Sequence, residues 1–316
     1  MDIKETYDVI IVGGGPAGLV AGLYCQRAAL KTVLFEKGLV GGQIAISKDV
    51  ENYPGVEGIT GLDLAEKLLH HAEAFGLRII QEEVAEINAG AGLHSVRLAN
   101  GDLLHSVALI LGAGGSVRKL GVPGEAEYLG SGVSYCPTCD GFFFKGRIVV
   151  VVGGGDTAVE EALFLSRLAS KVYLVHRGKT LRASKILQNR LLSESGIEVI
   201  WNTIVTEIKG DGRAVEAVSF EDTVTGEKRI LPTDGVFILI GYVPNNQLIP
   251  PEVRTNEQGF VITDERCESS VPGIFAVGDL RQKFATQIVI AAADGAIAAL
   301  AAAHYIEEKK AEVPIF

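Results

Sequence analysis

Two segments of the chain repeat one pattern 140 residues apart, and this repeat restricts the possible folds more than any other feature. Residues 9–38 read VIIVGGGPAGLVAGLYCQRAALKTVLFEKG, residues 149–178 read VVVVGGGDTAVEEALFLSRLASKVYLVHRG, and 11 of the 30 ungapped positions are identical. Each copy contains an apolar β-branched run, three glycines, a helical stretch and a second apolar run. This is the βαβ opening of a dinucleotide-binding domain, so the chain is predicted to hold two nucleotide sites.

Length and charge narrow the functional classes. A chain of 316 residues is long enough for two domains, each with its own core. The 29 Lys and Arg against 39 Asp and Glu give a net charge of −10, which disfavours nucleic-acid binding. The apolar stretch 288–305 contains Asp294 and His304, so we expect a buried helix and no membrane span.

The cysteines indicate where the protein works and what chemistry it uses. There are 4 cysteines, and residues 1–8 are too polar for a signal peptide, so a reducing, cytoplasmic location is expected. A Cys-x-x-Cys pair in that setting favours redox or metal chemistry over a structural crosslink.

The first glycine loop carries the full dinucleotide fingerprint. Gly13, Gly15 and Gly18 follow an apolar strand and open a helix, where free N–H groups can bind a pyrophosphate. Glu36 ends the next strand and can accept hydrogen bonds from a ribose diol. From this loop alone, the ligand can be FAD or NAD.

Residues elsewhere favour a flavin at this first site. Gly278 and Asp279 end a short strand, and Gln287 opens the last helix, whose N-terminus would stabilise an anionic flavin ring. The alternative for Asp279 is a helix cap. Gly42-Gln43 and Asn52 lie on a loop that could reach the ring; the alternative for this loop is a plain surface turn.

The second glycine loop favours a phosphorylated nicotinamide nucleotide. It comprises Gly153, Gly155 and Ala158, and the position of the ribose-binding carboxylate is taken by His176, followed by Arg177 and then Arg182. Cations there can pair with a 2′-phosphate, which favours NADPH over NADH. The alternative is a solvated basic turn.

The Cys136-Pro-Thr-Cys139 segment precedes the second repeat. A single pair with no second cysteine pair or nearby histidine argues against zinc, which needs four ligands, and no metal site is expected. We therefore expect a redox-active disulfide, with Asp140 placed to deliver a proton to a departing thiolate; an inert structural thiol pair is the alternative. Cys25 and Cys267 are expected to serve packing only.

Together these motifs resemble the low-molecular-weight thioredoxin reductases along nearly the whole chain. The matching segments are 13–18, 42–43, 51–55, 136–141, 153–162, 240–245 and 273–279. The resemblance implies an α/β fold with two Rossmann-like three-layer domains, each with a small β-meander. The FAD domain, residues 1–116 and 245–316, would be interrupted by the NADPH domain, residues 117–244.

The resemblance also implies a reaction and a set of site residues. A homodimeric flavoenzyme would pass hydride from NADPH to FAD and then reduce the Cys136–Cys139 disulfide. Cys139 would lie nearer the flavin, Cys136 would attack thioredoxin, and Asp140 would act as the general acid. The expected FAD site comprises Gly13, Gly15, Pro16, Ala17, Gly18, Glu36, Gly42, Gln43, Asn52, Gly114, Gly278, Asp279, Gln287 and Ile288. The expected NADPH site comprises Gly153, Gly155, Asp156, Thr157, Ala158, His176, Arg177 and Arg182.

Three departures from the family pattern keep other functions open. Gly178 stands where a second arginine is usual, Thr286 replaces an arginine before Gln287, and a hydroxyl is absent from 112–114. NADH or ferredoxin could therefore be the electron donor, and a small dithiol could replace thioredoxin as the partner. A non-catalytic flavoprotein redox sensor is a more distant alternative.

Overall fold

The computed structural model describes residues 6–47 and 50–312 and divides the chain into two compact units. Unit 1 comprises Met1–Ser116 and Val243–Phe316, and unit 2 comprises Val117–Tyr242. The sequence-based division placed the return to the first domain at residue 245. Residues 1–5, part of the N-terminal segment considered for a signal peptide, lie outside the described residues.

Unit 1 is built on a seven-stranded mixed sheet with the order β3-β2-β1-β6-β5-β4, in which β17 also pairs with β6. The strands are β1 (Thr6–Val12), β2 (Thr32–Glu36), β3 (Arg78–Gln81), β4 (Val84–Asn88), β5 (His94–Leu98), β6 (Leu103–Leu111) and β17 (Ile274–Ala276). The strands β1, β2, β3, β6 and β17 are paired in parallel, whereas β4, β5 and β6 form an antiparallel meander. The first apolar repeat therefore becomes the central strand β1.

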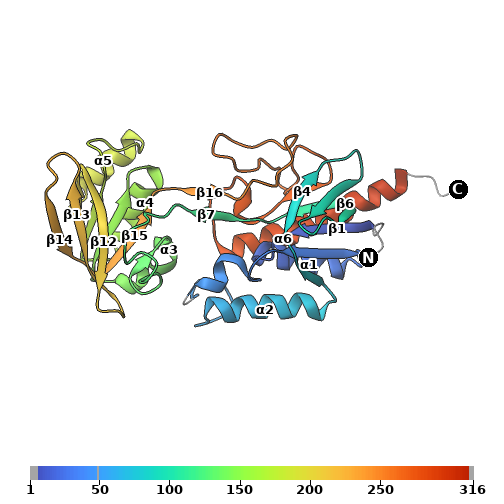
Figure 1. Ribbon diagram of the computed structural model, residues 1–316, viewed down its shortest axis with the longest axis horizontal. Coiled ribbons are helices and arrows are strands. Elements are labelled where there is room, and N and C mark those ends of the chain that lie inside the picture. The colour runs from blue at the N-terminus through green and yellow to red at the C-terminus, as the bar shows by residue number, and fades with distance from the viewer. Residues whose placement is uncertain (1–5, 48–49, 313–316) are drawn as a thin grey trace. The chain divides into compact units, whose positions relative to one another are not determined.

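Helices cover one face of this sheet. They are α1 (Pro16–Arg27), α2 (Gly61–Ala74) and α6 (Ile288–Glu312), with short 3-10 turns at η1 (Gly42–Ile46) and η3 (Gly278–Leu280). In Figure 1, α1 and α2 lie on one side of the strands β1 and β6, and the chain that follows β16 runs over the other side. A Cβ added at Gly295 of α6 would lie 2.1 Å from the Ala17 carbonyl oxygen, so α6 crosses α1 in direct backbone contact. Thr60 caps α2 by accepting the Asp63 N–H at 3.1 Å.

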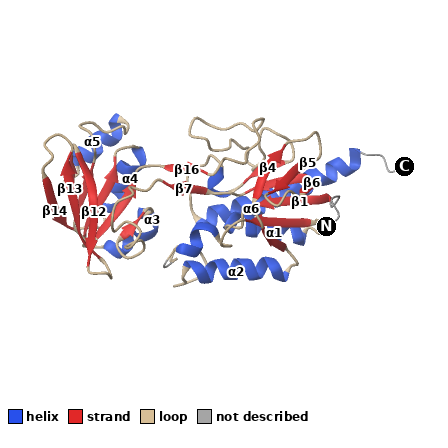
Figure 2. Cartoon of the chain, viewed as in Figure 1, coloured by secondary structure: helices blue, strands red, loops and turns tan. Residues whose placement is uncertain are grey.

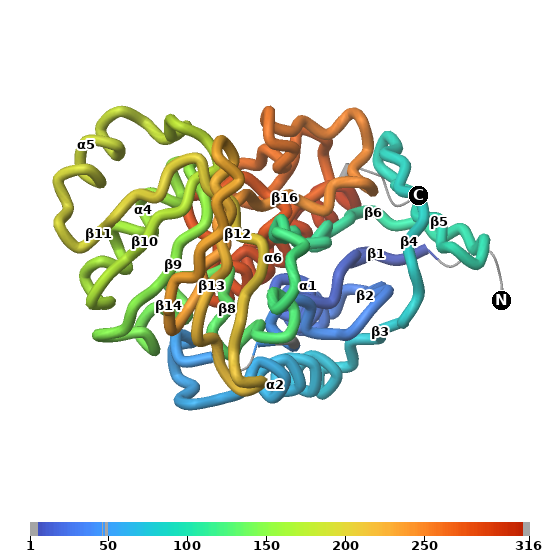
Figure 3. The backbone as a smooth tube through the Cα atoms, turned by 60° about the vertical axis from the view of Figure 1, so that its left-hand side comes forward, coloured from blue at the N-terminus to red at the C-terminus, as the bar shows by residue number. Residues whose placement is uncertain are grey.

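Unit 2 repeats the architecture with a five-stranded parallel sheet, ordered β11-β10-β9-β15-β8. The strands are β8 (Val133–Ser134), β9 (Ile148–Gly153), β10 (Lys171–Val175), β11 (Ile197–Ile200) and β15 (Gly235–Leu239). Helices α3 (Pro137–Asp140), α4 (Asp156–Leu165) and α5 (Lys185–Ser193) belong to this unit, with a 3-10 turn at η2 (Gly141–Phe144). Figure 3 shows β9, β10 and β11 running side by side. Figure 2 shows the strands of this unit in red and its helices α3, α4 and α5 in blue.

A separate antiparallel sheet of β12 (Thr203–Gly210), β13 (Val215–Asp222) and β14 (Lys228–Pro232) completes unit 2. Asp222 caps the β13–β14 turn by accepting the N–H groups of Val224 and Thr225. The predicted α/β class with two Rossmann-like units and small β-meanders is therefore confirmed.

The chain passes between the units twice, through β7 (Gly115–Val117) and β16 (Tyr242–Pro244), which pair with each other. Among the described residues, the segment 288–311 within α6 is the one helix long and apolar enough to span a membrane by length and composition alone. It packs on α1 in the core of unit 1.

Candidate functional site

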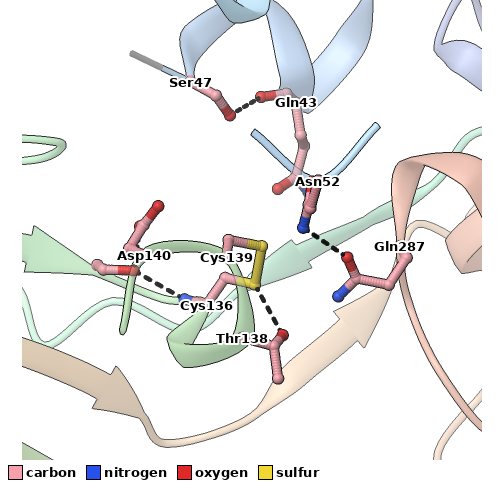
Figure 4. Close-up of a disulfide and its surroundings, with 9 residues drawn as sticks. Gln43, Ser47, Asn52, Cys136, Thr138, Cys139, Asp140 and Gln287 are labelled. Carbon is pink, nitrogen blue, oxygen red and sulfur yellow. Dashed lines mark hydrogen bonds between the residues drawn. A yellow bond between two sulfur atoms is a disulfide. The ribbon is translucent and has the colours of Figure 1, made fainter. Parts of the chain in front are cut away.

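The predicted cysteine pair is a disulfide in this structure. Cys136 and Cys139 are bonded, with their Cα atoms 5.3 Å apart, at the start of the one-turn helix α3 (Figure 4). Pro137 fits the first helical position because it needs no N–H partner there. The Cys139 N–H donates to the Cys136 carbonyl at 3.0 Å, which closes the turn. Cys136 is half-buried and Cys139 is exposed.

A serine that sequence reasoning missed joins Asp140 to this turn. The Ser134 hydroxyl donates to Asp140 Oδ2 at 2.6 Å and accepts the Cys136 N–H at 2.9 Å. Ser134 ends β8 and is buried, whereas Asp140 and Cys136 are half-buried, so this bridge is partly shielded from solvent. It fixes the carboxyl group of Asp140 beside the disulfide turn, where it can move a proton. No sequence pattern marks Ser134 for this role.

The second glycine loop lies at the carboxyl end of β9. The first-turn residues Asp156, Thr157 and Ala158 open α4 without a side-chain cap, which leaves this helix N-terminus suited to an anion. A Cβ on Gly153 would lie 2.5 Å from the Leu239 oxygen, whereas a Cβ on Gly155 would meet nothing within 4 Å. Gly153 is therefore needed for packing, and Gly155 leaves open the space in which a pyrophosphate can approach the protein backbone.

A cavity of about 700 Å³ adjoins this loop entirely within unit 2. Its lining includes Gly153 and Gly154 together with the predicted residues Arg177 and Arg182. Both arginine side chains are exposed, and among the described residues no carboxylate lines the cavity. The cavity therefore suits an anionic ligand. The lining also includes Arg118 and Lys119, which the sequence analysis did not identify.

His176 lines the same cavity, but its ring holds the protein backbone. Its Nδ1 lies 3.1 Å from the Gly153 carbonyl oxygen and its Nε2 lies 2.9 Å from the Thr180 carbonyl oxygen. Whichever ring nitrogen carries the proton can donate to the carbonyl oxygen beside it, so the ring is tied to the backbone of the loop. The ring thus supports the glycine loop, and the two arginines are left as the predicted phosphate partners.

The first glycine loop in unit 1 is shaped by close backbone contacts. A Cβ on Gly18 would lie 1.9 Å from the Gly13 oxygen, and one on Gly13 would lie 2.3 Å from the Gly112 oxygen. Gly13 also has a φ of +110°, which other residues rarely adopt. Gly15 again has nothing within 4 Å of an added Cβ, and α1, with Pro16 in its first turn, carries no side-chain cap. This cradle fits a pyrophosphate.

Glu36 reaches the same loop from the end of β2. Its Oε2 accepts the Gly14 N–H and its Oε1 accepts the Gly38 N–H, both at 2.7 Å. Each carboxylate oxygen has a second lone pair, so the group can still accept hydrogen bonds from a ribose diol. Gly114, with a φ of +67°, follows β6 at the same edge of the sheet.

The other predicted flavin-site residues lie in unit 1 as well. Asn52 Nδ2 donates to Gln287 Oε1 at 3.1 Å, which joins a loop to the residue before α6 across 235 positions of sequence (Figure 4). Ile288 begins α6, and Gly42 begins η1. The Gln43 side-chain amide donates to the Gly115 carbonyl oxygen.

Gly278 and Asp279 form η3 beside a buried network of charges that the sequence analysis did not predict. Asp294 of α6 is 4% exposed and accepts Arg281 Nη1 at 2.7 Å, Lys283 Nζ at 3.3 Å and the Gly278 N–H at 3.1 Å. Lys283 Nζ also lies 3.2 Å from Asp279 Oδ1. Two carboxylates and two cations therefore balance one another at Gly278 and Asp279, which belong to the predicted flavin site.

The remaining cysteines are free and buried. Burial raises the pKa of the Cys25 thiol to about 12 and that of the Cys267 thiol to about 11. Both thiols are thus protonated and unreactive at neutral pH. No cluster of three or more metal-ligating His, Cys, Asp or Glu side chains is found within residues 6–47 and 50–312.

Comparison with known proteins identifies the family. Residues 7–314 match the family described as pyridine nucleotide-disulphide oxidoreductase. The thioredoxin reductase of Bacillus subtilis is 47% identical over 98% of this chain and 97% of its own length. The crystal structure of thioredoxin reductase from Streptococcus pyogenes superposes with a TM-score of 0.93, at 41% identity over 96% of this chain and 99% of that one.

A thioredoxin reductase that is named for ferredoxin is also similar. The ferredoxin-flavin thioredoxin reductase of Clostridium acetobutylicum is 31% identical over 96% of this chain and 99% of its own, with a TM-score of 0.53. The resemblance to thioredoxin reductases that the motifs indicated is confirmed along nearly the whole sequence. The chain belongs to the pyridine nucleotide-disulphide oxidoreductase family, and its relatives there are thioredoxin reductases.

Proposed function

We propose that this chain is a thioredoxin-disulfide reductase that uses FAD and NADPH and acts as a cytoplasmic homodimer. The observation that carries the proposal is the Cys136–Cys139 disulfide held beside Asp140 in a family member with two glycine loops. The family implies a flavin and a nicotinamide cofactor. FAD in unit 1 and NADPH in unit 2 are our assignments.

The residues present fit both groups. In each loop the middle glycine, Gly15 or Gly155, leaves open the space that a Cβ would fill, and the helix that follows has no side-chain cap. Glu36 would bind the FAD ribose, and Arg177 and Arg182 would bind the NADPH phosphate. When bound, the flavin accepts a hydride from the nicotinamide and supplies two electrons to a disulfide.

The cysteine turn would carry out the exchange with the substrate. The Cys136 thiolate attacks one sulfur of the thioredoxin disulfide, forms a mixed disulfide and releases the other sulfur as a thiolate. Asp140 delivers a proton to the departing thiolate. The Cys139 thiolate then attacks the Cys136 sulfur, which restores the Cys136–Cys139 bond and releases reduced thioredoxin. Ser134 keeps the Asp140 carboxyl group in place through its 2.6 Å hydrogen bond.

Exposed apolar side chains near the disulfide favour a protein partner over a small dithiol. Phe142 and Phe143 follow the cysteine turn on η2 and are 65% and 48% exposed. Large exposed aromatic side chains next to a reactive group are typical of protein-recognition surfaces. We therefore expect Phe142→Ala to raise the KM for thioredoxin and to leave the rate with a small aromatic disulfide unchanged.

The test is an anaerobic titration of the purified protein with NADPH and, separately, with NADH. Loss of flavin absorbance followed by its recovery on adding thioredoxin is the expected result. Cys136→Ser should still lose its flavin absorbance and should fail to reduce thioredoxin. Gly155→Ala should retain flavin but no longer be reduced by the nucleotide, because its methyl group fills the phosphate cradle.

Three outcomes would contradict the proposal. Full thioredoxin reduction by Cys136→Ser would refute the cysteine mechanism. Failure of both nucleotides, with reduction by ferredoxin, would favour the donor of the clostridial relative. Nucleotide binding with no turnover by any partner would instead indicate the redox sensor.

A further inference from the structure

The cavity of unit 2 contains more positive charge than the predicted nucleotide motif provides. Four cationic side chains line it, namely Arg118, Lys119, Arg177 and Arg182, and no Asp or Glu of residues 6–47 and 50–312 does. None of the four makes a salt bridge within the part of the chain that the structure describes. In a chain with a net charge of −10, this concentration needs an explanation.

The segment that bears Arg118 and Lys119 is held firmly on both sides. The Arg118 N–H donates to the Gly241 oxygen at 2.9 Å. The N–H groups of Leu120 and Gly121 donate to the carboxylate of Glu125 at 2.9 Å and 2.6 Å. Glu125 is 3% exposed, so these bonds are protected from water. Lys119 is thereby placed between anchored neighbours, which reduces the entropy lost when it binds an anion.

The topology places these two cations across the glycine loop from Arg177. The Arg118 side chain lies beside Gly241, because a Cβ added to Gly241 would be 3.2 Å from Arg118 Cδ. Gly241 follows β15, and β15 pairs with β9 through Leu239 and Gly153. Arg177 follows β10 on the opposite side of β9. Cationic side chains therefore line the cavity on both sides of β9, the strand that ends in the glycine loop.

We infer that Arg118 and Lys119 are specificity-determining residues that bind the 2′-phosphate of NADPH. The inference rests on the proposed function. The pyrophosphate is served by the glycine loop and the N-terminus of α4, so four further cations exceed what NADH requires. A 2′-phosphate adds a charge of about −1.5 to −2 at pH 7. Arg118 and Lys119 thus provide, from another segment, the charge that Gly178 does not.

The test compares two small ligands that differ only in this group. Binding of adenosine 2′,5′-bisphosphate and of 5′-AMP to the purified flavin-containing protein is measured by isothermal titration calorimetry. Each exposed contact is worth about threefold to fivefold in affinity, so Arg118→Gln with Lys119→Gln should weaken bisphosphate binding about tenfold. Binding of 5′-AMP should change by less than about twofold.

Two controls keep the result specific. Arg190→Gln removes an exposed cation of α5 that does not line the cavity, and it should leave both affinities unchanged. Arg118→Lys with Lys119→Arg keeps the charges and should retain the preference for the bisphosphate. Retention also shows that substitution alone does not unfold the segment.

Three results would overturn the inference. They are unchanged binding of the bisphosphate by the double glutamine variant, equal weakening for both ligands, and no preference for the bisphosphate in the unaltered protein. Equal weakening would assign the two cations to the 5′-phosphate side. Because the readout is binding, failure to reduce thioredoxin would contradict the proposed function without affecting this measurement.

Discussion

Two glycines in one loop should respond to alanine in different ways. Gly15 has a φ of −74°, which alanine adopts readily, and an added Cβ has no neighbour within 4 Å. Gly18 lies three residues later, and its Cβ would approach the backbone oxygen of Gly13 to 1.9 Å. We predict that Gly15→Ala weakens flavin binding but keeps its stability, whereas Gly18→Ala loses stability.

The magnitudes follow from these surroundings. For Gly15→Ala, the free energy of unfolding without flavin should change by less than about 1 kcal/mol, because alanine meets no atom there. Its methyl group enters the space for the pyrophosphate, and overpacking of about 1–3 kcal/mol corresponds to a roughly fivefold to 150-fold rise in the FAD Kd. Gly18→Ala forces helix and loop apart, since the clashing atom belongs to the backbone, and should cost about 3 kcal/mol or more.

The assay uses flavin-free protein and two spectroscopic signals. Urea unfolding followed by circular dichroism reports on the whole chain, and titration with FAD gives its Kd. The single tryptophan, Trp201, lies in unit 2, so the unfolding midpoint followed by its fluorescence should be the same for both variants. Equal destabilisation by the two substitutions, or unaltered FAD affinity in Gly15→Ala, would refute the geometric argument.

Four further predictions concern single sites. Asp294→Ala should lower the free energy of unfolding by about 3–5 kcal/mol in urea titrations, because two buried cations lose their common carboxylate. Burial lowers the pKa of His94, so the unfolded chain takes up this proton first and the free energy of unfolding falls as the pH drops below about 6.5. The free energy of unfolding should therefore differ less between pH 5.5 and pH 7.5 in His94→Gln than in the unaltered protein. Native protein should react with a thiol reagent at pH 8 only after reduction, and then at Cys136 and Cys139 alone, because Cys25 and Cys267 are buried. Labelling of all four cysteines would contradict this. Gly178→Arg should tighten bisphosphate binding in calorimetry about threefold or more, since a Cβ there meets only the His176 ring, at 3.4 Å.

The elements and the placement of the loops were predictable because their causes are local. A β-branched run such as 149–152, a glycine that must take a positive φ and a proline at the first helical position each act within a few residues. The apolar run, the three glycines and the helix that follows them recur in the same order at 149–165, and this repetition made the two-unit fold readable. The helix expected within 288–305 is the N-terminal part of α6.

The contacts that sequence reasoning missed join residues with no local pattern. Asp294 meets Arg281 and Lys283 because η3 packs against α6, and nothing in the order of those residues indicates that contact. Arg118 and Lys119 follow β7 and resemble an ordinary polar connection until the fold brings them to a cavity. Ser134 likewise becomes significant only because the cysteine turn folds back over the end of β8.

The two repeats also show how one position separates two ligands. Glu36 and His176 occupy the same place, and both hold their glycine loop, but with opposite polarity. The carboxylate of Glu36 accepts the Gly14 N–H, whereas the ring of His176 contacts the Gly153 carbonyl oxygen. The first loop therefore keeps a carboxylate that accepts from ribose hydroxyls and repels a 2′-phosphate, while the second has an imidazole in that place and lies among cations. Exchange of these two side chains would disrupt both loops before it altered specificity, because each residue is a support as well as a recognition group.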